Sequence, residues 1–212
     1  VYFLKYSNPW IWGNRISLKF DLLYNSISQH HSYDSLNCEK SFAIGSGFQY
    51  NQFHNFNAQL GFTNIFVEPT ENHGKKSYTL NYFKSKINYN YDCRNIKIDP
   101  TKGQLINLKL YSDWGINNSP TSHSISLLSK FYFSPLKINI EPVFSYTIKA
   151  IFQTNINSLP FYYKKYLGGE DYVRGYSPVP SENGEFENYI EVDNLICQTL
   201  ETQFTILNKI EQ

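Results

Sequence analysis

Apolar and polar residues alternate along much of this chain, and this alternation restricts the possible fold more than any other feature. Between Leu136 and Phe152 the even positions are mainly apolar, and the odd positions are mainly polar or charged. Successive side chains of a β-strand point to opposite faces of a sheet, so a period of two predicts a strand with two different faces. Similar patterns run from Ile16 to Tyr24 and from Ile196 to Ile206. The chain should therefore form a sheet with one apolar and one polar face.

The composition indicates that such a sheet lies in a membrane. Of the 212 residues, 17% are aromatic and 17% are charged, and the mean hydropathy is −0.44. A soluble domain carries about 25% charged residues, and a helical membrane protein needs runs of about 20 apolar residues, which this sequence lacks. A transmembrane β-barrel has the observed mixture, because half of each strand faces lipid and half faces water. The net charge of +1, with scattered basic residues, argues against a nucleic-acid surface.

The sequence predicts an all-β fold, an antiparallel transmembrane β-barrel of the meander type. We expect about nine strands, at residues 1–6, 14–25, 41–50, 55–67, 77–92, 103–113, 121–133, 136–152 and 189–207. Short connections at 8–13, 51–54, 98–102 and 134–135 alternate with longer ones at 26–40, 68–76, 114–120 and 153–188. Short turns at one end and long loops at the other are typical of outer-membrane barrels.

An odd number of strands predicts that the sheet is incomplete. Single-chain bacterial barrels close with an even number of strands, and an open edge in lipid leaves backbone groups unpaired. We therefore expect residues 1–212 to be a truncated portion of a barrel domain, with one long loop at 153–188.

The same alternation predicts which side chains lie on each face of the barrel wall. In a membrane barrel the apolar set Leu136, Ile138, Ile140, Phe144, Tyr146 and Ile148 should be exposed on the convex face. The polar set Lys137, Asn139, Glu141 and Lys149 should line the concave face. A soluble sandwich would place the apolar set in a closed core instead.

Three motifs stand out against this pattern. The most specific is the glycine-rich segment 167–176, whose marked residues are Gly168, Gly169, Val173, Arg174, Gly175 and Tyr176. Glycine permits positive φ and close backbone approach, so the segment should form a tight turn beside an aromatic ring.

The second motif joins a strand end to a short turn and contains Asp92, Arg94, Asp99, Pro100 and Gly103. Pro100 fixes φ, and Gly103 supplies a left-handed position. The third, residues 7–10, is a short Asn-Pro turn.

In order and approximate spacing, the three motifs resemble those of the BamA family of outer-membrane β-barrels over nearly the whole chain. The resemblance implies that the loop 153–188 folds back into the barrel lumen. It also implies that Arg174 pairs there with an inward-facing carboxylate, for which Glu201 is the candidate. Asp92 and Arg94 would face the lumen and organise its interior, although an ordinary role as charges at the wet end of a strand is equally compatible with the sequence.

The resemblance further implies a function, the folding and insertion of other β-barrel proteins into the outer membrane of a Gram-negative cell or an organelle. The partners would be unfolded outer-membrane precursors, periplasmic chaperones, accessory assembly lipoproteins and the lipid bilayer. A secretion pore for two-partner or autotransporter export, from the same superfamily, is the nearest alternative. A passive porin, a soluble β-sandwich and a barrel fused to a lipase-like domain are further alternatives.

The sequence contains no pattern that predicts catalysis, a metal site or a cofactor. Cys38, Cys93 and Cys197 are odd in number and far apart, and the pair His30 and His31 has no third ligand at a useful spacing. Nucleotide-binding, hydrolase-elbow and metalloprotease motifs do not occur. We therefore expect a protein that is not an enzyme and needs no cofactor.

Overall fold

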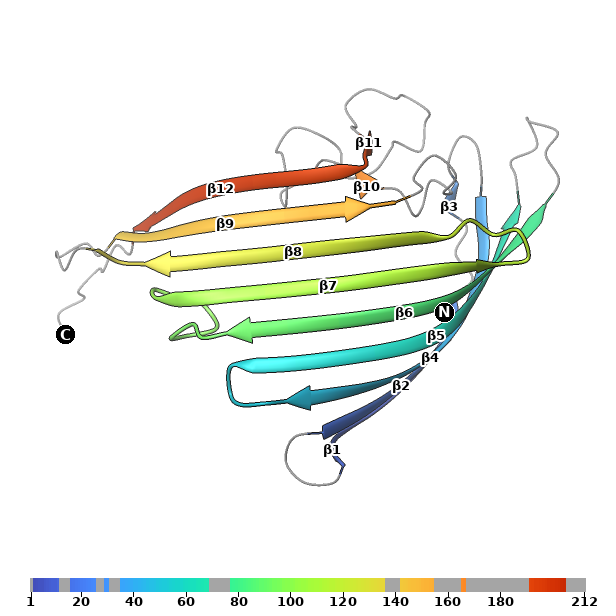
Figure 1. Cartoon of the computed structure of the whole chain (residues 1–212), viewed down its shortest axis with the longest axis horizontal. Helices are drawn as coiled ribbons and strands as arrows, with labels where there is room; N and C mark the ends of the chain where they lie inside the picture. The colour runs from blue at the N-terminus through green and yellow to red at the C-terminus, as the bar shows by residue number, and fades with distance from the viewer. Residues whose placement is uncertain are drawn as a thin grey trace, which may run out of the picture.

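The chain folds into one curved antiparallel sheet with a small two-stranded sheet beside it (Figure 1). The structure, a computed structural model, describes residues 2–11, 16–25, 29–30, 35–68, 77–135, 142–154, 165–166 and 191–204. Within these ranges every regular element is a β-strand. No helix in them is long and apolar enough to cross a membrane.

The strands follow one another in sequence order across the large sheet. They are β1 (Tyr2–Ile11), β2 (Ile16–Asn25), β4 (Ser35–Gln49), β5 (His54–Glu68), β6 (Tyr78–Asp92), β7 (Gly103–Ile116), β8 (Ser122–Phe133), β9 (Pro142–Gln153) and β12 (Asn194–Phe204). The short β3 (Gln29–His30) pairs with β4, and β10 (Lys165–Tyr166) pairs with β11 (Glu191–Val192). Each neighbouring pair along the path is antiparallel, which confirms the predicted meander.

The convex face of the sheet is apolar and exposed. Large apolar side chains at alternate positions of neighbouring strands lie there, among them Leu18, Leu22, Phe42, Ile44, Leu60, Phe62, Ile87, Leu110, Ile125, Phe152, Ile196 and Leu200. On β9, Phe144, Tyr146 and Ile148 share this face, and Lys149 lies on the other with Val143 and Ile151. The predicted assignment of faces is therefore confirmed for the described part of this segment, although Phe144, Tyr146 and Ile148 are half-buried and not exposed as expected. Residues 136–141 lie outside the described part.

Aromatic rings gather at both ends of the convex face. At the short-turn end, the ring centroids of Phe56 and Tyr89 are 4.8 Å apart, and those of His54 and Tyr91 are 4.7 Å apart. At the long-loop end, Trp114 stacks with Phe83 at 5.5 Å and meets the edge of His123 at 6.1 Å. Two aromatic belts with aliphatic residues between them are typical of a membrane-spanning barrel wall. This arrangement argues against the soluble sandwich.

Several predicted boundaries are wrong. Residues 7–10 were expected to form a turn, but they continue strand β1, whose pairing with β2 shifts register between Asn8 and Ile11. Pro9 has no N–H to donate, and an irregularity in the end strand of the described sheet tolerates it. Strand β4 begins at Ser35, inside the loop predicted for 26–40, because its polar first residues still pair with β5. Strand β7 continues to Ile116, and the turn that follows is shorter than expected.

That turn is tight because two consecutive residues adopt positive φ. Asn117 and Asn118 have φ values of 52° and 68°, and the amide of Ser119 donates to the carbonyl oxygen of Ile116 at 3.2 Å. Asparagine tolerates the left-handed region better than other side chains that carry a Cβ. The hairpin between β7 and β8 therefore closes without glycine in these two positions.

The two faces should respond oppositely to an added charge. On β6, Ile87 is 50% exposed on the convex face, and its neighbour Asn88 lies on the concave one. Because a lysine on the lipid side must leave water, we expect Ile87→Lys to lower the free energy of unfolding by about 2 to 4 kcal/mol. Asn88→Lys should cost less than about 1 kcal/mol. Denaturant unfolding of the full-length protein in lipid vesicles measures both, and a larger loss for Asn88→Lys would contradict the assignment of faces.

Candidate functional site: the concave face

The concave face of the sheet is lined by polar side chains held in pairs across strands. Lys19 Nζ donates to Asn57 Oδ1 at 3.3 Å, and Gln59 Nε2 donates to Asp21 Oδ2 at 3.0 Å. Further along, Asn107 Nδ2 lies 3.1 Å from Asn88 Oδ1 and 3.3 Å from Asn90 Oδ1. These bonds join residues that the register places on one face, so they stiffen the wall without closing it.

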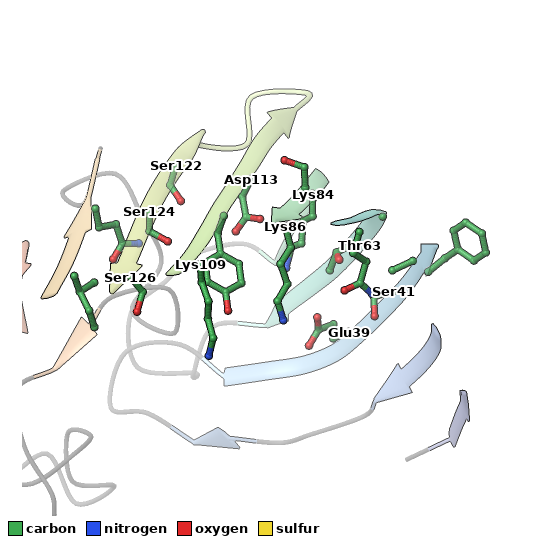
Figure 2. Close-up of a pocket in the computed structure, with 18 residues that line it drawn as sticks. Glu39, Ser41, Thr63, Lys84, Lys86, Lys109, Asp113, Ser122, Ser124 and Ser126 are labelled. Carbon is green, nitrogen blue, oxygen red and sulfur yellow. The ribbon is translucent and has the colours of Figure 1, made fainter. Parts of the chain in front are cut away.

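A hollow of about 560 Å³ opens on this face over strands β4 to β9 (Figure 2). Its lining consists of Glu39, Ser41, Phe42, Ala43, Gln59, Gly61, Thr63, Lys84, Ser85, Lys86, Lys109, Tyr111, Asp113, Ser122, Ser124, Ser126, Ile151 and Gln153. Small side chains predominate on β8 and at positions 43 and 61, and long ones on β6 and β7. A Cβ on Gly61 would lie 2.6 Å from the carbonyl oxygen of Phe42, so glycine permits the close backbone approach there.

Charged side chains from different strands converge in the hollow. Lys84 and Asp113 are direct cross-strand neighbours. Lys86 Nζ lies 5.4 Å from the centre of the Tyr111 ring, within the range of a cation–π contact. In Figure 2, Lys86 and Lys109 extend into the same space as Glu39. The hollow therefore combines positive and negative groups with hydroxyl donors.

Beside the hollow, at the long-loop end, the concave face carries a small apolar cluster. Ile65, Val67, Leu80 and Tyr82 are all at most 7% exposed, and Tyr78 packs against them. Their burial contrasts with the exposed residues of the convex face. This cluster is therefore covered on the concave side, whereas the large apolar residues named for the convex face are open.

Asp92 and Arg94 form a two-pronged ion pair at the short-turn end. Arg94 Nε lies 2.8 Å from Asp92 Oδ1, and Arg94 Nη2 lies 2.9 Å from Asp92 Oδ2. Each side chain is 16% exposed. Hydrogen bonding to Asp92 raises the pKa of the Arg94 guanidinium above its ordinary value. Arg94 Nη1 also donates to the Lys97 carbonyl oxygen at 3.1 Å, so the pair ties the strand end to its turn.

The turn after Arg94 depends on Gly103 and on an asparagine that the sequence analysis missed. Gly103 has a φ of +103°, and a Cβ there would lie 2.4 Å from the carbonyl oxygen of Cys93. Asp99, just before Pro100, also has a positive φ of 56°. Asn95 Oδ1 accepts from the amides of Thr101 and Lys102 at 3.1 Å. Asparagine commonly organises turns in this way.

The glycine-rich segment lies outside the described residues. This holds for Gly168, Gly169, Val173, Arg174, Gly175 and Tyr176, and the predicted contact of Arg174 with Glu201 therefore stays a prediction. Glu201 itself is described. It faces Ser145 across β12 and β9 on the concave face, it is exposed, and the Ser145 hydroxyl donates to its Oε2 at 3.5 Å.

The cysteines and histidines considered as metal ligands are described only in part. In the described ranges, no group of three or more His, Cys, Asp or Glu side chains could hold a metal ion. Cys93 and Cys197 are half-buried thiols. The side chains of His30, His31 and Cys38 are not described.

Comparison with protein families gives one match to nearly the whole sequence. The Omp85 superfamily domain matches residues 1–209. Comparison with curated proteins found no significant match.

Comparison with solved structures gives a similar fold. The chain is similar to BamA from Haemophilus ducreyi, crystallised without POTRA domains 1–3, with a TM-score of 0.71 and 15% sequence identity. The alignment covers 94% of this chain and 44% of that one. This chain therefore spans less than half the length of that structure, and the similarity shows the fold of the barrel wall.

Loss of the Asp92–Arg94 pair should weaken the wall. Because Arg94→Gln leaves a largely buried carboxylate without its two charged donors, we expect the free energy of unfolding to fall by about 1 to 3 kcal/mol. Lys97→Gln is the matched control, since it removes the same charge from an exposed side chain in the same turn. Denaturant unfolding in lipid vesicles compares the two variants, and equal stabilities would show that the ion pair contributes nothing.

Proposed function

Because the chain belongs to the Omp85 superfamily, we propose that it forms part of an outer-membrane insertase, a protein that folds and inserts other β-barrel proteins. The observation that carries this proposal is the match of the superfamily domain to almost every residue of a sheet with an exposed apolar convex face and a polar concave face. Such a wall stands in lipid on one side and lines water on the other. The proposed location is the outer membrane of a Gram-negative cell or an organelle.

In this proposal, the sheet acts through its surfaces and edges. The convex face anchors the wall in the bilayer, and the aromatic belts fix its depth. A sheet edge presents unpaired N–H and C=O groups, which an incoming strand can extend by backbone pairing. In the described part, β12 pairs with β9 and with no other strand of the path. A client strand would pair with an edge strand at the seam where the two edges of the barrel meet. This pairing, assisted by local thinning of the bilayer, would allow insertion of the client without a nucleotide.

We propose that Arg174 clamps the loop 153–188 to the lumen wall through Glu201. The support is that Glu201 lies on the concave face and is exposed, with one oxygen near the Ser145 hydroxyl. A guanidinium inside a partly dewatered lumen needs a counter-charge to offset its desolvation. Its two-pronged geometry suits a carboxylate.

The proposed partners are unfolded outer-membrane proteins, accessory assembly lipoproteins, periplasmic chaperones and the lipid bilayer. We assign no catalytic residue, metal or cofactor. In this proposal, pairing of backbone groups and transfer of apolar side chains into lipid drive the insertion of client proteins.

Variants of the clamp test this function in cells that depend on the full-length protein. Because loss of the charge pair frees the loop, we expect Arg174→Ala and Glu201→Gln to slow the assembly of outer-membrane proteins severalfold without preventing folding of the barrel itself. Gln203→Ala, on the same face of β12, is the matched control and should behave as wild type. Assembly is measured by the amount of folded outer-membrane proteins and by growth.

Two results would contradict the proposal. Normal assembly in both clamp variants would show that the Arg174–Glu201 contact has no functional role. Normal assembly after depletion of the whole protein, together with loss of one secreted protein, would identify a secretion pore instead.

A further inference from the structure

Two ammonium groups in the hollow lack an ion-pair partner among the described residues. Lys86 projects from β6 and Lys109 from the neighbouring β7, and both side chains are half-buried. The ion pair between Arg94 and Asp92 lies outside the hollow and involves neither lysine. The described contact of Lys86 is with the face of the Tyr111 ring, which does not neutralise it. Partly desolvated cations of this kind favour binding of an anion.

We propose that this hollow binds the carboxylate side chains of an extended acidic segment of a client polypeptide. That the acidic segment belongs to a client polypeptide rests on the proposed function. That the ligand is a carboxylate rests on the side chains that line the hollow. Lys86 and Lys109 would donate to the carboxylates. The hydroxyls of Ser122, Ser124 and Ser126, on the adjoining β8, would bond to the polar groups of the peptide.

The charge of the lining favours carboxylates over phosphates. Three lysines and two acidic residues, Glu39 and Asp113, surround the hollow, which leaves a formal charge of +1. Each carboxylate of a peptide carries one charge and can lie at a separate lysine, whereas a phosphate places two negative charges at one point, where the two fixed carboxylates would repel it more strongly. Lysine is also a point charge, without the planar fork with which arginine binds phosphate through two bonds.

The spacing of the lining groups favours an extended chain. Ser122, Ser124 and Ser126 are alternate residues of one strand. Lys86 and Lys109 are diagonal neighbours on two adjacent strands, because Lys86 pairs with Tyr111, and such neighbours lie about 7 to 8 Å apart. Alternate residues of a strand lie about 6.6 to 6.8 Å apart, and alternate side chains of an extended peptide have the same separation. Carboxylates at every second position of a client segment would therefore match the lining.

Peptide binding to the full-length protein in nanodiscs tests this proposal. The probe is a fluorescent eight-residue peptide in which Glu and Thr alternate, and a peptide with Gln in place of Glu is its neutral counterpart. We expect the acidic peptide to bind, the neutral one to fail, and the double variant Lys86→Gln/Lys109→Gln to weaken binding at least about tenfold, since two charge-assisted contacts are lost. Lys130→Gln, on the same face of β8 but outside the hollow, is the matched control and should bind as wild type.

A carbodiimide, which couples an amine to a carboxylate in contact with it, identifies what the lysines touch. Coupling of Lys86 or Lys109 to the acidic peptide supports the proposal. Coupling to Glu39 or Asp113 alone, or to Glu182 or Glu185 of the chain's own loop, would overturn it. Binding of inorganic phosphate with no binding of the peptide would overturn it as well.

The two proposals can fail separately. Normal assembly of outer-membrane proteins by a wild-type protein that binds no acidic peptide would overturn this inference and leave the proposed function intact. Peptide binding by a protein whose depletion does not affect assembly would overturn the proposed function, and with it the assignment of the peptide to a client.

Discussion

The structure depends on the register of backbone pairing between neighbouring strands from β2 to β12. Because side chains alternate between faces, a slip by a single residue in any strand would move its apolar set from the convex to the concave face. The described pairings shift only near strand ends, between Asn8 and Ile11 and between Leu36 and Cys38. The apolar band, the aromatic belts and the polar hollow all follow from this one constraint.

The fold was largely predictable from the sequence, because the same alternation that sorts the faces also marks the strands. Errors arose where backbone pairing continues without an apolar pattern. The residues from Ser35 to Lys40 are mostly polar, but their backbone still bonds to β5, and residues 7–10 continue β1 past a proline. Side-chain hydrophobicity reports the lipid-facing length of a strand, whereas the paired length extends further into water.

The site was only partly predictable. Asp92 and Arg94 are neighbours in sequence, so their alternation placed them together, and the glycine at 103 marked the turn. Lys86 and Lys109 could be assigned to polar faces in the same way, whereas Glu39 fell in the loop predicted for 26–40. Their convergence could not be predicted, because it depends on the register of strands that are far apart in sequence. The support of the turn by Asn95 was missed because asparagine is common in exposed loops.

The central claim is that the convex face meets lipid and the concave face meets water. Spin labels placed singly along β6, from position 84 to position 90, measure this directly in the full-length protein in bilayers. The account predicts that access to oxygen, which concentrates in lipid, peaks at the odd positions, and that access to a water-soluble nickel chelate peaks at the even ones. The opposite phase, or no alternation, would contradict the account.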